Sequence, residues 1–178
     1  MKCSKQLAQS KTNASGAFKF NAQKAPKDSV FYLVAKGPNE AVALMSLLGT
    51  SLPEKVTVNE LTTVASTFTA ARFIKGEAIS GKALSLRIAS GNTPNLVDPV
   101  TGEWGKVLLD PLNSSMTTTM ANLDTLGSLI SAYATVANDD WRARFLKAAT
   151  PPNGLTPKNT LQAMAGIARA PWAAPKEL

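Results

Sequence analysis

Hydrophobic and polar positions divide the chain into an N-terminal part with strand-like alternation and a longer part with helical spacing. Residues 30–35, Val-Phe-Tyr-Leu-Val-Ala, are a compact run of β-branched and aromatic residues and form the strongest strand signal. Residues 17–20 alternate small or apolar side chains with basic and aromatic ones. Between them and residues 8–12, the sequence Asn-Ala-Ser-Gly at 13–16 predicts a hairpin turn, since Gly16 can take a positive φ at no steric cost.

We therefore expect about three strands within residues 1–36. A second turn is predicted at residues 26–28, and Lys36-Gly37-Pro38 ends the last strand. Three strands alone form a thin sheet with exposed edges. They must therefore pack on the helices, on a partner, or on strands outside this chain.

The clearest helix start lies within residues 56–65. Thr57 is predicted to cap this helix by accepting a hydrogen bond from the backbone N–H of Glu60, whose side chain reaches back to the N–H of Thr57. Val56 and Leu61 can close over the same end as a hydrophobic staple. An apolar stripe at helical spacing follows, made of Leu61, Val64, Ala65, Phe68 and Ala71.

From residue 39 onward the chain has helical periodicity. Helices are predicted at residues 40–48, capped by Asn39 and stopped by Gly49; at residues 58–75, ended by Gly76; between Ser80 and Gly91; at residues 119–137; from Asn138 to Pro151; and from Thr156 or Asn159 to Pro171. Residues 92–118 are predicted to be a long loop, which Trp104 and the run 107–109 hold against the core.

Three residues in the later helices have predicted packing roles. Gly127 lies inside residues 119–137, where glycine costs roughly 1 kcal/mol relative to alanine, so we expect a close helix contact there. Trp141 and Phe145 are four residues apart and should share one helix face.

The predicted fold is therefore α+β and predominantly α, with a short N-terminal β-hairpin or sheet followed by an irregular bundle of about six helices. We divide the chain into a β segment at residues 1–36 and a helical module at residues 37–178. With 178 residues, 44% of them hydrophobic, the chain can bury a core of its own. No apolar run approaches the roughly 18 to 20 residues that cross a bilayer, and we identify no secretory signal in this sequence.

The charge balance adds a candidate binding surface. Lys and Arg number 19 against 12 Asp and Glu, which gives a formal net charge of +7. No run of three basic residues occurs, and most of the positive charges are scattered. Seven lysines lie within the first 36 residues: Lys2, Lys5, Lys11, Lys19, Lys24, Lys27 and Lys36. Such a basic end favours an anionic polymer, such as a polysaccharide, a nucleic acid or a membrane surface.

Missing residue types exclude several classes of site. The chain has no histidine, which removes the commonest general base and the commonest metal ligand. Its single cysteine, Cys3, excludes an intrachain disulfide and a thiolate metal cluster, and leaves a free thiol or an interchain bond. The S-x-x-K spacing of a Ser–Lys dyad, the glycine-rich phosphate motifs and the G-x-S-x-G elbow do not occur. We therefore assign no catalytic, cofactor-binding or metal-binding residue and expect no cofactor.

Two further residue sets invite a chemical interpretation. The 92–118 segment carries oxygen ligands at Asp98, Glu103, Asp110, Asn95 and Asn113, but their spacing matches no oxygen-rich calcium loop. The three tryptophans could stack on a sugar or a base, although packing in the core or an interface is the role we assign to Trp104, Trp141 and Trp172.

Several motifs resemble a family of large, mostly secreted or cell-surface proteins of soil bacteria. They are TVNELTTVAS at 57–66, GNTPNLVD at 91–98, DPLNSS at 110–115, and NTLQA at 159–163 with IAR at 167–169. In this family a helical module like residues 39–178 lies upstream of a β-propeller of NHL-like repeats. It follows an Ig-like or carboxypeptidase-regulatory-like β segment that ends in T-D-x-x-G-x-F. Residues 12–18, Thr-Asn-Ala-Ser-Gly-Ala-Phe, resemble this ending, with Asn13 at the usual Asp.

The resemblance implies a place in a bacterial extracellular or cell-surface protein. Its partners would be neighbouring domains of the same polypeptide, above all the β-propeller, and other cell-surface proteins. The propeller, a signal peptide and most of the β domain lie outside this chain. Relatives are expected to carry cysteines in the fourth and fifth helices, whereas Tyr133 and Arg142 stand near those places here, so a family disulfide is not carried over. The family has no assigned catalytic residues, and none is transferred.

Three hypotheses of function follow from these patterns. The first is a non-catalytic structural or interaction module that links a β domain to a downstream β-propeller. The second is a binding module for an anionic polymer through the N-terminal lysines. The third is an enzyme that acts through residues 92–118, which would need carboxylates, or Ser and Lys, gathered in one pocket.

Overall fold

The structure is a computed structural model that describes residues 5–21 and 28–176. Within these residues it contains two small antiparallel sheets and seven helices, so the predicted α+β, predominantly α class is confirmed. In chain order the elements are β1 (Phe31–Lys36), β2 (Ala43–Gly49), α1 (Glu60–Ala70), β3 (Ile74–Lys75), β4 (Ala78–Ile79), α2 (Ala83–Leu96), α3 (Lys106–Leu109), α4 (Pro111–Met116), α5 (Thr119–Thr135), α6 (Asp139–Ala148) and α7 (Thr160–Arg169).

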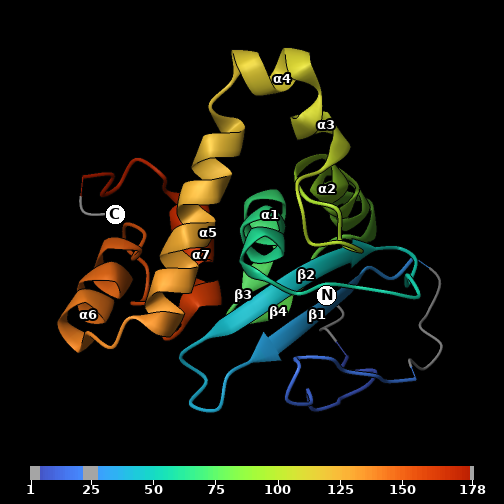
Figure 1. The fold of residues 1–178 in the computed structure, drawn as a ribbon, viewed down its shortest axis with the longest axis horizontal. Helices are drawn as coiled ribbons and strands as arrows, with labels where there is room; N and C mark the ends of the chain where they lie inside the picture. Colours follow the sequence, from blue (N-terminus) through green and yellow to red (C-terminus); the bar gives the residue numbers. More distant parts are fainter. Residues whose placement is uncertain (1–4, 22–27, 177–178) are drawn as a thin grey trace.

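Helix α1 lies at the centre of the molecule, with α5 and α7 on one side of it and α2 on the other (Figure 1). Strand β2 also packs on α1, whereas β1 lies farther out and packs mainly on β2. Because it has neighbours on most sides, α1 buries seven of its residues: Thr62, Thr63, Val64, Ala65, Ser66, Thr67 and Ala70.

Buried apolar side chains form two clusters. The larger joins the helices and includes Val64, Ala65, Leu123, Ile130, Tyr133, Phe145 and Met164. The smaller lies between the β1–β2 sheet and the helices and includes Met45, Leu47, Ala70, Ile74, Ile79 and Leu161. Tyr32 and Val34 of β1 cover this second cluster as partly buried side chains.

Hydroxyl groups from two helices close the inner edge of the β1–β2 sheet. The backbone N–H groups of Ala43, Met45 and Leu47 donate to the hydroxyl oxygens of Thr160, Thr63 and Ser66, at 3.0, 2.9 and 2.9 Å respectively. Thr63 and Ser66 lie on α1, and Thr160 is the first residue of α7. A buried N–H without a partner is costly, so these hydroxyls do for β2 what a third strand would otherwise do.

The prediction of a helix at residues 40–48 was wrong, because most of this segment is strand β2. It pairs antiparallel with β1, with Val34 opposite Met45. A turn with Glu40 at φ 57° joins the strands, and the Asn39 side chain accepts from the N–H of Ala41 within that turn. Apolar residues lie on both faces of β2, so the segment lacks the alternation that marks a half-buried strand.

The predicted cap of α1 was wrong by two residues. Asn59 is the N-cap, its side chain accepts from the N–H of Thr62, and the Thr62 hydroxyl accepts from the N–H of Asn59. Thr57 is held instead by the segment after α2, since its N–H donates to the carbonyl of Pro99 and its hydroxyl to that of Val100, both at 2.8 Å. Thr57 therefore connects the chain ahead of α1 to the segment after α2 and does not cap the helix.

The helix predicted at residues 58–75 ends at Ala70, and the β3–β4 hairpin follows it. Gly76 sits in that hairpin with φ 61°, so its freedom serves a turn between strands rather than a helix end. The next helix, α2, has Lys82 as N-cap instead of Ser80 and runs through both Gly91 and Pro94. The predicted loop at residues 92–118 therefore contains the last turn of α2 together with α3 and α4.

The N-terminal strands are only partly as predicted. Residues 31–36 are a strand, but residues 8–12 and 17–20 are not. The hairpin turn between them does form: the N–H of Asn13 donates to the carbonyl of Ala17, and Gly16 has φ 79°. Residues 26 and 27 of the second predicted turn lie outside the described residues.

The last three helices agree closely with the prediction. Asn138 caps α6 and Asn159 caps α7, each through its side-chain oxygen. Among the described residues, no helix is both long enough and apolar enough to cross a membrane.

Candidate functional site

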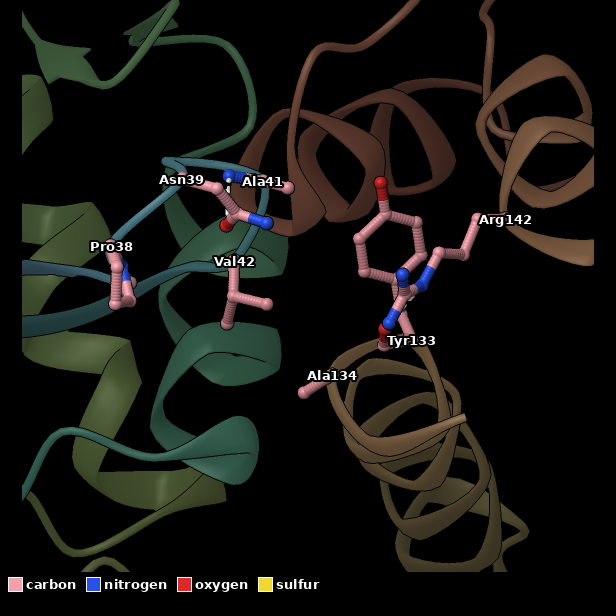
Figure 2. Close-up of a pocket in the computed structure, with 8 residues that line it drawn as sticks. Pro38, Asn39, Ala41, Val42, Tyr133, Ala134 and Arg142 are labelled. Carbon is pink, nitrogen blue, oxygen red and sulfur yellow. Dashed lines mark hydrogen bonds between the residues drawn. The ribbon is translucent and has the colours of Figure 1, made fainter. Parts of the chain in front are cut away.

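A surface hollow lies between the β1–β2 turn and the corner that joins α5 to α6. It has a volume of about 390 Å³. One wall is the turn, which contributes Gly37, Pro38, Asn39, Ala41 and Val42; the other wall is Tyr133, Ala134 and Arg142. Figure 2 shows Asn39 and Val42 facing Tyr133 and Arg142 across this hollow.

Arg142 is fixed by its own corner of the structure. Its Nε donates to the carbonyl oxygen of Tyr133 at 3.0 Å, and its guanidinium lies over the Tyr133 ring, 5.6 Å from the centroid. Its Nη1 also donates to the exposed carboxylate of Asp139 at 3.4 Å. These three contacts hold the guanidinium against the aromatic wall.

The hollow offers polar binding groups but no acid–base pair. Its lining residues supply the Arg142 guanidinium, the Asn39 amide and the Tyr133 ring. A guanidinium with N–H groups to spare recognises carboxylate or phosphate oxygens. The arrangement can therefore hold a small anionic group, while no carboxylate, lysine or cysteine lines it among the described residues.

A second hollow, of about 200 Å³, lies between the start of α1 and the middle of α5. Its lining includes two carboxylates and two hydroxyls, from Glu60, Asp124, Ser128 and Ser131. Glu60 lies in the first turn of α1, where a negative charge is favourable against the helix dipole. Leu61 and Gly127 form the rest of its lining.

The predicted packing residues have mixed outcomes. A Cβ at Gly127 would come within 3.1 Å of Leu61 Cδ2, so the expected close contact of this glycine is confirmed, and its neighbour is α1. Trp141 and Phe145 stack with their ring centroids 5.6 Å apart, as their spacing predicted. Phe68 does not reach the core, because it is 38% exposed.

Three of the five candidate ligands of residues 92–118 make side-chain hydrogen bonds to the backbone of that segment. Asp98 accepts from the N–H of Val100, and Asp110 caps α4 by accepting from the N–H of Leu112. The amide of Asn113 donates to the carbonyl of Val107. Among the described residues, no three Asp, Glu, His or Cys side chains gather as metal ligands.

The same segment projects from the body of the protein with apolar side chains exposed. Helix α4 joins α3 to α5 at the end of the molecule away from the sheet (Figure 1). Leu109, Leu112 and Met116 are 54%, 77% and 81% exposed. We call these three residues the α4 apolar surface.

A polar cluster that the sequence did not indicate links three distant segments. Lys36 Nζ at the end of β1 lies 2.6 Å from Glu77 Oε2 in the β3–β4 turn, and Glu77 Oε1 accepts from the buried Asn159 amide at 2.8 Å. This carboxylate, with a smaller contribution from Glu40, raises the pKa of the Lys36 ammonium above its usual 10.5. Asn159 ahead of a helical pattern indicated a cap, but nothing in the sequence indicated its partner.

The N-terminal lysines are divided by their surroundings. Lys5, Lys11 and Lys19 are exposed, whereas Lys36 is engaged with carboxylates. The remaining predicted lysines and Cys3 lie outside the described residues: Lys2, Lys24 and Lys27.

Comparison of the chain with protein-family models, with curated protein sequences and with solved structures finds no match.

Proposed function

We propose that this chain is a non-catalytic structural and interaction module of a bacterial extracellular protein, and that it links a β domain to a downstream β-propeller. The α4 apolar surface carries this proposal. Exposed leucine and methionine side chains on neighbouring turns are a common mark of a protein–protein contact. The propeller of the same polypeptide is the partner that the sequence resemblance suggests.

The α4 apolar surface is held by an ordered scaffold. Val97 and Trp104 form a β-bridge at the base of the projection, and Gly105 donates to the carbonyl of Leu96. Asp110 and Asn113 fix the corner between α3 and α4. A surface that is already ordered loses less entropy on binding, which favours a docking role.

The interior hydroxyls also fit a structural role. Thr63 and Ser66 accept from β2 and donate to carbonyls of their own helix, Asn59 and Thr62 respectively. Their hydrogen-bonding capacity is therefore taken up by the fold.

The test is binding of the full chain to the separately produced propeller region of the same polypeptide. A double variant, Leu112→Ser with Met116→Ser, should weaken binding by tenfold or more, about 1.4 kcal/mol, since truncated anchors at the centre of an interface commonly cost this much. Leu155→Ser is the matched control, because Leu155 is 92% exposed on the connection between α6 and α7. It should bind like the wild type.

Two results would contradict the proposal. One is equal binding of the wild type and the double variant to the propeller. The other is turnover of a substrate by the purified chain that a single point substitution abolishes.

A second candidate function is binding of an anionic polymer, favoured by the exposure of Lys5, Lys11 and Lys19 near the N-terminus. Contacts between lysines and phosphate or sulfate groups release counterions, so this binding should weaken steeply as salt rises. Replacing the three lysines by glutamine should reduce both the affinity for heparin and its salt dependence. Binding that ignores salt would contradict it.

A further inference from the structure

The hollow between the β1–β2 turn and the α5–α6 corner presents hydrogen-bond donors that the fold does not use. A guanidinium has five N–H groups, and Arg142 commits two of them, its Nε–H to the carbonyl of Tyr133 and one Nη1–H to Asp139. Within residues 5–21 and 28–176, no hydrogen bond uses its Nη2. Three N–H groups are therefore left for a ligand, on a guanidinium whose position is already fixed.

The Tyr133 hydroxyl is a second donor on the same wall. This tyrosine is only 5% exposed, because its ring packs against Trp141 and Phe145. A buried tyrosine usually pairs its hydroxyl, yet this one has no hydrogen-bond partner among the described residues. The unpaired side-chain atoms that are sealed from solvent are instead Ser46 Oγ and Trp104 Nε1. The Tyr133 hydroxyl is therefore open to solvent and can reach a group bound in the hollow that this residue lines.

The opposite wall supplies one polar group within an apolar surface. The Asn39 oxygen accepts from the N–H of Ala41, which leaves its Nδ2 amide without a partner among the described residues. Pro38, Ala41 and Val42 line this side, and Ala134 lines the other (Figure 2). The lining thus combines donors for an anion with contact area for an apolar group.

We propose that this hollow binds a carboxylate carried on a short apolar group, as in a small organic acid or the last residue of a peptide. Arg142, the Tyr133 hydroxyl and the Asn39 amide donate to the carboxylate oxygens, and the apolar side chains contact the remainder. Its volume of about 390 Å³ lies in the range of small-molecule sites.

The charge of the hollow favours a carboxylate over a phosphate. Its single guanidinium is shared with Asp139, and no lysine lines the hollow among the described residues. The site therefore offers at most one positive charge, which matches a carboxylate and leaves a doubly charged phosphate partly unneutralised. The proposal does not depend on the α4 apolar surface.

The test titrates the isotope-labelled full chain with N-acetylleucine and with N-acetylleucinamide, which has a similar shape and no charge. The acid should shift the magnetic resonance signals of the Arg142 Nε–H and the Asn39 side-chain amide, and saturate them at millimolar concentration. It should bind about tenfold or more tightly than the amide, because hydrogen bonds to a charged group are the stronger ones. Inorganic phosphate should bind more weakly than the acid, since it gains nothing from the apolar wall.

A tetrapeptide that ends in leucine distinguishes the two sources of the carboxylate. Tighter binding than that of N-acetylleucine assigns the hollow to a peptide end, and equal or weaker binding assigns it to a free acid.

Two substitutions test the donors themselves. Tyr133→Phe removes a hydroxyl that no described residue binds, so it should weaken binding of the acid about two- to tenfold and leave thermal unfolding unchanged. Asp139→Asn removes the carboxylate that competes for the guanidinium, so it should tighten binding about two- to fivefold. Asp140→Asn is the matched control, because Asp140 lies in the same turn of α6 but pairs with Arg144. It should bind the acid like the wild type.

Three results would overturn the proposal. The signals of Arg142 and Asn39 could stay unchanged up to tens of millimolar acid. The uncharged amide or phosphate could bind as tightly as the acid, which would remove either the charge or the apolar wall from recognition. Asp139→Asn and Asp140→Asn could have equal effects, which would place the anion away from Arg142. If Tyr133→Phe fails to fold, the comparison of these two variants still decides.

Discussion

Hydroxyl groups of single residues satisfy the backbone N–H groups along the edge of β2 that faces the helices. Thr63 is fully buried, accepts from the N–H of Met45 at 2.9 Å and donates to the carbonyl of Asn59 at 2.6 Å. Hydroxyls inside helices usually bond back to their own helix and contribute little. Here the same oxygen also satisfies a strand, which gives it an architectural role.

Thr63→Val should therefore destabilise the protein by about 1–3 kcal/mol, because it leaves the buried N–H of Met45 without a partner at almost unchanged volume. Thr125→Val is the matched control: its exposed hydroxyl donates only to Ala121 of its own helix, and the change should stay within about 0.5 kcal/mol. Urea unfolding followed by circular dichroism measures both. Equal effects would show that the bond to Met45 adds nothing.

Two glycines within helices should respond differently to replacement by alanine. Gly91 in α2 is exposed with open space around it, so Gly91→Ala should stabilise the protein by about 1 kcal/mol through helix propensity. Gly127→Ala should gain less, because the new methyl group would lie 3.1 Å from Leu61 Cδ2. Thermal melts of both variants measure the difference.

Measuring Gly127→Ala in a Leu61→Ala variant separates the effect of helix propensity from the effect of the contact with Leu61. Once the leucine side chain is shortened, Gly127→Ala should recover most of the gain seen at Gly91. An equal effect of Gly127→Ala in both backgrounds would rule out the contact as the reason for the smaller gain.

At the scale of elements, the sequence predicted helix caps and faces well where local chemistry decides. Asn138 with Asp139 and Asp140 marked the start of α6, and the spacing of Trp141 and Phe145 placed their stacked rings. These features depend on residues within one turn of each other, so they can be deduced without the rest of the fold.

The sequence failed where a distant segment decides. Residues 43–49 are rich in helix formers, yet they are a strand because β1, Thr63, Ser66 and Thr160 supply partners for their backbone. Thr57 had the chemistry of a cap, but the carbonyls of Pro99 and Val100 engage it. The two hollows likewise combine segments far apart in the chain, so their linings could not be deduced from spacing.

The Lys36–Glu77 ion pair connects the end of β1 to the β3–β4 turn, and it should make the stability of the protein depend on pH. Because the pKa of Lys36 is raised in the folded state, its contribution to stability is complete below pH 10.5 and is lost as pH rises through the folded value. Glu77→Gln keeps an oxygen for Asn159 and removes the charge. This substitution should lower the free energy of unfolding by up to about 1 kcal/mol at neutral pH, since the side chains of Lys36 and Glu77 are both partly exposed.

The difference in unfolding free energy between wild type and Glu77→Gln should shrink above pH 10.5, and also at high salt. Glu40→Gln is the control: Glu40 is 69% exposed and 3.5 Å from Lys36, so its removal should have little effect. A difference that persists unchanged to strongly alkaline pH would exclude the charge interaction as its source.

For the whole molecule, the question is whether residues 37–178 fold without the β segment. The boundary at residue 36 falls between β1 and β2, the two strands of one hairpin. Removing β1 would leave unpaired the backbone groups of Leu44 and Ser46 that face β1. It would also uncover the cluster that Tyr32 and Val34 pack against.

We therefore expect residues 37–178 to lose cooperative thermal unfolding, while residues 28–178, which keep β1 and the Asp28–Arg87 ion pair, melt within a few degrees of the full chain. Circular dichroism of the three proteins side by side measures this. A cooperative transition in residues 37–178 at the temperature of the full chain would instead make the helical module autonomous. The hydroxyls of α1 and α7 would then suffice to hold β2 as a single strand, and β1 would not be needed for the stability of residues 37–178.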